Sequence, residues 1–206
     1  MHPLVRFQQE CTAFFQALSP EGQCPLVFGD GLSENPVLML IGEAPGEQET
    51  LQGKPFVGKA GKNLTAFLEA VGLEREQLYV SNVVKIRPTK QSASGGTVNR
   101  PPNAEEKALF TPWLMREIAI VRPCALVTLG NVALQAFIQD TVGHLHGQWS
   151  RAVIAPPEAQ AFTLPLFALY HPASVIYNRS LTEVYQNDLT ILRDSLRARS
   201  PEKSDI

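Results

Sequence analysis

Four short apolar segments recur along this chain, and stretches with helical spacing separate them. The segments are residues 37–41, 78–84, 125–130 and 166–170. Continuous apolar runs of this length are typical of strands that are buried on both faces, and their alternation with helices is typical of a parallel sheet. We therefore expect an α/β fold with three layers, α/β/α, around a central four-stranded, mainly parallel sheet.

The length and composition favour one domain. The chain has 206 residues, of which 44% are apolar, and this is enough for one substantial core. We expect residues 1–206 to form a single domain, with a helix and lead-in over 1–25 and a disordered tail over 198–206. Because the chain shows neither a long apolar span nor a signal-peptide pattern, we expect a soluble, cytoplasmic protein with no membrane partner. We also expect a monomer.

The cysteines and the charge exclude several classes of protein. Three cysteines, at positions 11, 24 and 124, are too scattered for a disulfide framework or a metal knuckle, so we expect buried thiols. His144 and His146 form a His-x-His pair, but a third ligand with suitable spacing is missing, and we expect no metal. The net charge of −2 does not indicate a non-specific nucleic-acid binder, although it leaves room for a local basic patch.

Polar residues stand where three of the predicted strands end. Glu43 follows the first strand, Asn82 lies at the end of the second, and His171 follows the fourth. Each of them alone is more simply interpreted as a turn or cap residue. Because the carboxyl ends of parallel strands meet at one edge of a sheet, where ligands bind, we expect the three side chains to share one pocket. Glu47 and Glu49 belong to the same Gly/Pro-rich loop as Glu43.

Five motifs, in order and spacing, resemble those of family 4 uracil-DNA glycosylases, and the resemblance spans about residues 27–192. They are Gly42-Glu43-Ala44-Pro45-Gly46, the stretch 53–61 with Phe56, Ser81-Asn82-Val83-Val84-Lys85, Thr128-Leu129-Gly130 and His171-Pro172-Ala173. The resemblance implies a DNA repair enzyme that hydrolyses the bond between uracil and deoxyribose and leaves an abasic site. The implied partner is uracil-containing DNA, and no organic cofactor is needed.

The residue types suit this chemistry. A base that leaves the DNA stack is read on its Watson–Crick edge and stacked on an aromatic ring, and the Asn82 amide and the Phe56 ring are the candidates. Negative charge develops on uracil as the bond breaks, so we assign His171 as a hydrogen-bond donor to O2. We place the Glu43 carboxylate near C1′, where it acts directly or through a polarised water molecule. We place Gly42, Ala44 and Glu49 among the substrate-binding residues. The sequence does not divide the roles among Glu43, Glu47 and Glu49.

DNA must also be held outside the pocket. Basic residues in or beside the active loops suggest phosphate contacts, and in the superfamily the segment after the His-Pro turn wedges into the duplex. The candidate DNA-binding residues are Lys85, Arg87, Arg100, Ser174, Ile176 and Arg179, with Tyr177 as an alternative to Ile176 for the wedge. We expect the polar stretch 88–103 to be a mobile surface loop.

The chain departs from family 4 at the iron–sulfur cluster. Two positions that hold cysteine in that family are Ile86 and Phe110 here, so we expect no [4Fe–4S] cluster, and apolar packing would then replace it. A related branch of the superfamily links to DNA through a histidine after the second strand, and residues 82–103 contain none, which favours turnover. Two alternatives stay open: a weak or inactive DNA-binding or regulatory protein, and a glycosylase for another deaminated or mismatched base.

Overall fold

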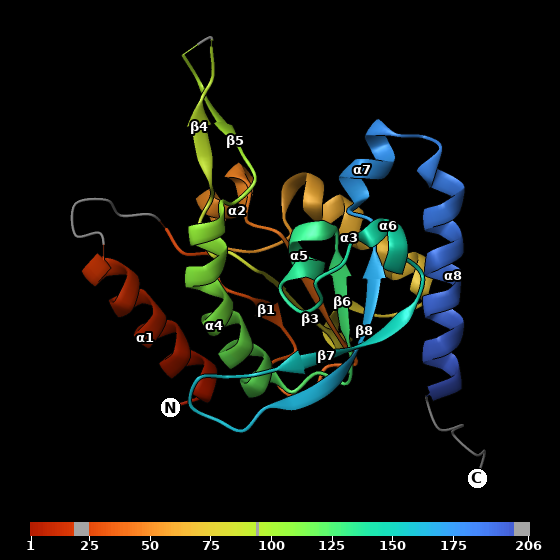
Figure 1. The fold of residues 1–206 in the computed structure, drawn as a ribbon, viewed down its shortest axis with the longest axis horizontal. Coiled ribbons are helices and arrows are strands. Elements are labelled where there is room, and N and C mark those ends of the chain that lie inside the picture. The colour runs from red at the N-terminus through yellow and green to blue at the C-terminus, as the bar shows by residue number, and fades with distance from the viewer. Residues whose placement is uncertain (19–24, 94, 200–206) are drawn as a thin grey trace.

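The computed structural model describes residues 1–18, 25–93 and 95–199. Its centre is a six-stranded sheet in the order β1-β3-β2-β6-β8-β7 (Figure 1). The four inner strands run parallel and correspond to the four apolar segments of the sequence. They are β3 (Leu78–Asn82), β2 (Leu38–Gly42), β6 (Leu126–Leu129) and β8 (Phe162–Leu169).

The prediction of four strands is wrong in number, because each edge of the sheet carries one further antiparallel strand. β1 (Asp30–Gly31) pairs with β3, and β7 (Trp149–Ile154) pairs with β8. β1 has only two residues and both are exposed, while β7 is buried at Ala152 and Ile154 but exposed at Arg151 and Val153. Neither strand forms a continuous apolar run, since an edge strand is covered less completely than a central one.

Helices cover both faces of the sheet and complete the predicted three layers (Figure 1). Side chains that alternate along each inner strand point to opposite faces. One face packs against α1 (Pro3–Leu18) and α4 (Ala104–Val121), and the other against α3 (Gly58–Val71) and α8 (Leu181–Arg199). α8 therefore includes residues 198 and 199 of the expected tail, and residues 200–206 lie outside the described ranges.

Short elements connect these layers, and several of them gather at the carboxyl edge of the parallel strands (Figure 1). The stretch 88–103, which we expected to be a mobile loop, forms a two-stranded hairpin that projects from this edge. The short elements are α2 (Glu47–Gln52), the 3₁₀ turn η1 (Arg75–Gln77), β4 (Thr89–Gln91), β5 (Thr97–Asn99), α5 (Asn131–Gln135), α6 (Val142–Leu145) and α7 (Pro172–Tyr177).

The thiols differ in their surroundings. Cys11 is fully buried in α1, as expected, whereas Cys124 is exposed, which corrects the expectation for that residue. Cys124 stands between α4 and β6, where the chain passes over the amino edge of the sheet. Cys24 lies outside the described residues. None of the helices within the described ranges is long and apolar enough to cross a membrane.

Candidate active site at the carboxyl edge of the sheet

The register of the parallel strands aligns the residues that follow them. Gly42 of β2 lies opposite Asn82 of β3, and Leu129 of β6 lies opposite Leu169 of β8. Glu43 and His171 therefore leave the sheet at the same edge. Val83 and Val84 extend this alignment, because their backbone N–H groups donate to the carbonyl oxygens of Gly42 and Glu43.

A cavity of about 420 Å³ opens at this edge. Glu43 and Ala44 form one wall, His171 and Ser174 another, and the base of the β4–β5 hairpin a third. The structure thus brings both predicted catalytic residues to one space. The complete lining is Glu43, Ala44, Pro45, Pro88, Asn99, Arg100, Leu129, Gly130, Asn131, Val132, Val142, Tyr170, His171 and Ser174.

Glu43 is the carboxylate that faces the cavity. Burial raises the pKa of its carboxyl group, and the positive charge of Lys107 in α4 partly opposes that rise. Within the described ranges no hydrogen bond joins its carboxylate to another residue. A carboxylate held in this way is available to a water molecule or to a positive charge that develops on a ligand.

His171 is the N-cap residue directly before α7, and its ring is held in the neutral form. Its Nδ1 accepts a hydrogen bond from the backbone N–H of Ala173 at 3.2 Å, so the ring proton sits on Nε2. Burial lowers the pKa of the ring, which keeps it neutral at neutral pH. Gly130, with φ of 86°, allows the close approach, since a Cβ there would lie 3.2 Å from that of His171. His171 is therefore a hydrogen-bond donor through Nε2.

Gly42, Asn82 and Phe56 meet behind Glu43. A Cβ on Gly42 would lie 2.4 Å from the Asn82 Oδ1 atom and 3.1 Å from the Phe56 ring, so glycine is required for this contact. Asn82 is 5% exposed, and its amide has no hydrogen-bond partner among the described residues. Phe56 has φ of 55° and lines a smaller space of about 20 Å³ that shares His171 and Leu129 with the large cavity.

The other two carboxylates of the loop have different places. Both Glu49 oxygens accept backbone N–H groups, from Gly46 and from Val57, each at 3.1 Å, and the residue is 8% exposed. Glu49 thus ties the loop after β2 to the segment that carries Phe56. Glu47 is exposed and pairs with Arg87 at 3.1 Å. Of the three, Glu43 is the one that lines the cavity.

The prediction that Lys85 contacts DNA is wrong, because the residue is fully buried. Its Nζ donates to Glu117 Oε2 at 2.6 Å, to Ser81 Oγ at 2.6 Å and to the Asn82 carbonyl oxygen at 2.8 Å. Glu117 also accepts from the Tyr79 hydroxyl at 3.0 Å. This network holds the end of β3, where Asn82 lies. Sequence reasoning missed Glu117, although its place on the apolar stripe of α4 was a signal of a buried partner.

The remaining candidate DNA contacts lie around the opening. Arg87 donates to Asn99 at 2.7 Å as well as to Glu47, and both guanidinium NH groups of Arg100 donate to Glu106 at 2.7 Å. Ser174 lines the cavity, and Arg179 lines a separate groove between α3, α7 and α8. Ile176 falls within α7, but its side chain lies outside the described residues.

The residues at the cluster positions do not fit an iron–sulfur cluster. Phe110 is 1% exposed and stacks on Phe15 of α1, with ring centroids 4.2 Å apart and an angle of 9°. Ile86, at the other cluster position, packs partly buried against the same core, and neither side chain offers an atom that can ligate iron. No group of three or more potential metal ligands occurs in the described parts of the chain. The absence of a cluster from the protein stays a prediction.

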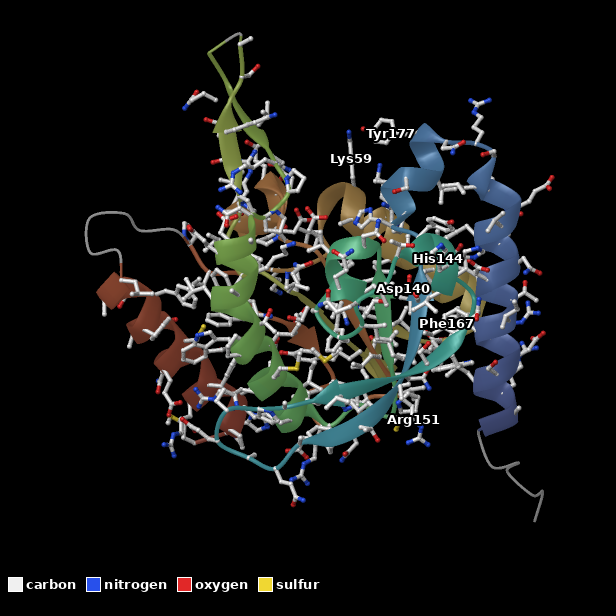
Figure 2. All side chains as sticks on the ribbon, in the orientation of Figure 1. Lys59, Asp140, His144, Arg151, Phe167 and Tyr177 are labelled. Atoms are coloured by element: carbon white, nitrogen blue, oxygen red, sulfur yellow. The ribbon has the colours of Figure 1, made fainter. Side chains whose placement is uncertain are left out.

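The two histidines of the His-x-His pair have separate partners. His144 Nδ1 lies 2.9 Å from Asp140, and His146 Nδ1 lies 2.9 Å from Asp188. His146 also packs on Tyr170, with ring centroids 5.0 Å apart. His144 is exposed and Asp140 is half-buried, and Figure 2 shows the two residues near each other. The pair is thus divided between two acidic side chains, and the absence of a metal stays a prediction.

Fold and cavity together define an α/β protein whose ligand site lies at the carboxyl edge of a parallel sheet. A family model described as the uracil DNA glycosylase superfamily matches residues 28–193. The Type-4 uracil-DNA glycosylase of Archaeoglobus fulgidus is 33% identical over 179 residues, which cover 84% of this chain and 83% of the relative. The chain belongs to the uracil-DNA glycosylase superfamily, and the resemblance inferred from its motifs is confirmed.

A second relative agrees with this assignment, and a solved structure agrees with the fold. The Type-4 uracil-DNA glycosylase of Sulfurisphaera tokodaii is 36% identical over 163 residues, covering 76% of this chain and 69% of the relative. The crystal structure of SMUG2 from Pedobacter heparinus has a TM-score of 0.50 at 17% sequence identity, and the likeness covers 80% of this chain and 76% of that one. At this identity the structural likeness concerns the fold alone.

Proposed function

We propose that this protein is a DNA repair glycosylase that hydrolyses the N-glycosidic bond between uracil and deoxyribose and leaves an abasic site. The observation that carries the proposal is the pairing of a carboxylate, Glu43, with a neutral imidazole, His171, on two walls of one cavity. The names of the relatives point to the same activity. The enzyme would be a monofunctional hydrolase, with no organic cofactor required.

His171 stabilises the leaving base in this mechanism. As the glycosidic bond breaks, negative charge gathers on the uracil ring, and the Nε2–H of His171 donates to O2. A neutral donor suits this role because it needs no proton transfer and is already oriented by its bond to the Ala173 N–H. A pre-positioned donor of this kind contributes about 3–4 kcal/mol to transition-state stabilisation.

Glu43 acts on the sugar side. Positive charge develops on the deoxyribose as the base leaves, and an ionised carboxylate stabilises that charge or orients the attacking water. The burial of Glu43 strengthens this interaction, since charges attract each other more in a region that excludes water. Ala44 and Gly42 keep the backbone close to the base, because neither adds bulk to this wall.

Asn82 and Phe56 select and hold the base. The Asn82 amide offers an acceptor and a donor side by side, which matches N3–H and O4 of uracil and mismatches cytosine. Its lack of a partner among the described residues supports this role. The 20 Å³ space beside Phe56 holds about one water molecule, so the Phe56 wall moves outward when the ring enters. Glu49 positions that wall through Val57.

The DNA around the base would be held by Arg87, Arg100, Ser174 and Arg179, with the α7 segment filling the vacated place in the duplex. Exposure supports this role for Arg179 and for Tyr177, whose side chain is 90% exposed.

A single domain, a monomeric state and a cytoplasmic location also stay predictions. The cytoplasmic location agrees with the free thiols of Cys11 and Cys124, the two cysteines within the described residues, since cytoplasmic proteins rarely form disulfides.

The test uses single- and double-stranded oligonucleotides that carry uracil, hypoxanthine or mismatched thymine, scored for alkali-labile breaks. We expect breaks at uracil. Asn82→Ala should lower the rate roughly hundredfold or more, because it removes contacts to the charge that develops on the base. Arg151→Ala, at an exposed position of β7 far from the cavity, is the matched control and should leave the rate unchanged (Figure 2).

Each other result has a defined meaning. Breaks at hypoxanthine or thymine but not at uracil would assign a different base. DNA binding without breaks on any substrate would favour the regulatory alternative. Equal rates for Asn82→Ala and Arg151→Ala would contradict the assignment of the pocket.

A further inference from the structure

The β4–β5 hairpin stands apart from the layered core. Thr89 pairs with Asn99, Lys90 with Val98 and Gln91 with Thr97, and this two-stranded ladder is separate from the six-stranded sheet. In Figure 1 it projects beyond the helices at the carboxyl edge. Its strand residues are exposed except for Thr89, which is half-buried.

The β4–β5 hairpin needs stabilising contacts beyond its own two strands. An isolated two-stranded hairpin is marginally stable in water, because it buries little apolar surface. Here side-chain bonds hold its base: Arg87 bridges Asn99 and Glu47, and Arg100 pairs with Glu106 and donates to the Thr89 carbonyl oxygen. The chain therefore fixes the position of an arm whose outer part has no protein surface to pack on within the described residues.

The charge of the arm favours a polyanion as its partner. No acidic residue occurs from Asn82 to Asn103, whereas Lys90 is exposed on β4. Of the other exposed strand residues, Gln91, Thr97 and Asn99 are neutral hydrogen-bonding groups, which suit phosphate and sugar oxygens, and Val98 is apolar. In a chain with a net charge of −2, an exposed segment without acidic residues is a local departure from the whole.

The arm also lies at the entrance of the cavity. Its base supplies Pro88, Asn99 and Arg100 to the lining, and Ser174 of α7 belongs to another wall of the same cavity. Figure 2 shows Tyr177, and Lys59 of α3, at the same end of the molecule as the arm, while Arg151 lies at the opposite end. A DNA strand that places one nucleotide in the cavity must continue past this arm.

We propose that the β4–β5 hairpin is an arm that grips the sugar–phosphate backbone of the DNA next to the flipped nucleotide, with Lys90 as its phosphate contact; this rests on the proposed function. Three residues of strand extend roughly 10 Å, about three base-pair steps of a duplex. A two-stranded β-ribbon also has the width that the major groove of DNA admits. The arm thus extends the enzyme's footprint beyond the nucleotide in the cavity.

The experiment measures binding to a duplex that carries a stable abasic-site analogue, as a function of salt concentration. Lys90→Glu should weaken binding about fivefold to tenfold at low salt and reduce the slope of log K against log salt by about one. Arg151→Glu is the matched control, because it changes the net charge by the same amount at an exposed position of the opposite end. A second variant replaces residues 90–98 by two glycines and should weaken binding at least as much.

Two further duplexes, each shortened to a few nucleotides on one side of the abasic analogue, identify the side on which the arm lies. Removal of the nucleotides that the arm contacts should abolish the difference in binding between wild type and Lys90→Glu. Binding by both arm variants that equals that of Arg151→Glu would overturn the proposal. If the wild-type protein releases no uracil but the arm variants still weaken DNA binding, the proposed function fails and the arm stands. If the wild-type protein releases uracil but the arm variants bind DNA as well as Arg151→Glu does, the arm proposal fails and the proposed function stands.

Discussion

At the scale of single residues, the surroundings of Glu43 set the expected pH dependence. Burial raises the pKa of this carboxyl group, so its active, ionised form is lost at a higher pH than for an exposed glutamate. The rate should therefore fall on the acidic side as pH drops through that raised pKa. His171 does not shift this acidic limb of the pH–rate profile to higher pH, because burial lowers the pKa of its ring.

Lys107→Ala tests this account. The Lys107 charge lowers the pKa of Glu43, so its removal should shift the acidic limb of kcat/KM to higher pH and leave the rate at alkaline pH nearly unchanged. The measurement is a pH–rate profile on a uracil oligonucleotide, with Arg151→Ala as control. An unchanged limb would show that another group controls the acidic side.

Residue types at strand ends were readable from the sequence, but side-chain partners were not. Glu43 and His171 follow apolar runs, and parallel pairing is enough to bring such positions to one edge. Lys85 stands equally close to a strand end, yet its partner Glu117 is 32 residues away in α4. Nothing local distinguishes a lysine that meets DNA from one that is buried on a carboxylate. The same holds for Glu49, whose partners are two backbone N–H groups.

At the scale of elements, the central strands were predictable and the edges were not. A strand covered on both faces reads as a continuous apolar run, as 78–82 and 126–129 do. β1 has two exposed residues, and β4 and β5 are polar, so nothing in their composition separates them from loops. Their pairing partners, rather than their own side chains, make them strands.

The buried Lys85–Glu117 pair joins β3 to α4, and its removal one side at a time should be costly. Lys85→Met leaves Glu117 charged and without its partner in a site that is 0% exposed, which should lower the free energy of unfolding by about 3–5 kcal/mol. Lys85→Met combined with Glu117→Leu removes both charges and should recover much of that loss. Urea denaturation of the wild type, Lys85→Met, Glu117→Leu and the double variant measures the cycle, and additive losses would contradict the coupling.

At the scale of the whole molecule, an aromatic cluster joins α1 to the rest of the fold. Phe15 and Phe110 stack, and Trp113 contacts Phe7 and Phe15 with ring centroids 6.0 and 6.2 Å apart. Phe110 occupies a position where family 4 carries a cluster cysteine. Packing between α1 and α4 thus places an apolar residue at that position, in agreement with the prediction that no cluster connects these elements.

This arrangement predicts how the protein responds to metal removal. Protein purified without oxygen and with iron supplied should contain no stoichiometric iron and show no visible absorption band, and a chelator should leave its midpoint of urea unfolding unchanged. Phe110→Ala should lower the free energy of unfolding by about 3–5 kcal/mol in the same metal-free protein, because it opens a cavity beneath α1. Phe14→Ala is the matched control: that ring is 40% exposed, so its loss should cost clearly less. Stoichiometric iron, or a midpoint that falls with chelator, would show that metal rather than aromatic packing makes this connection.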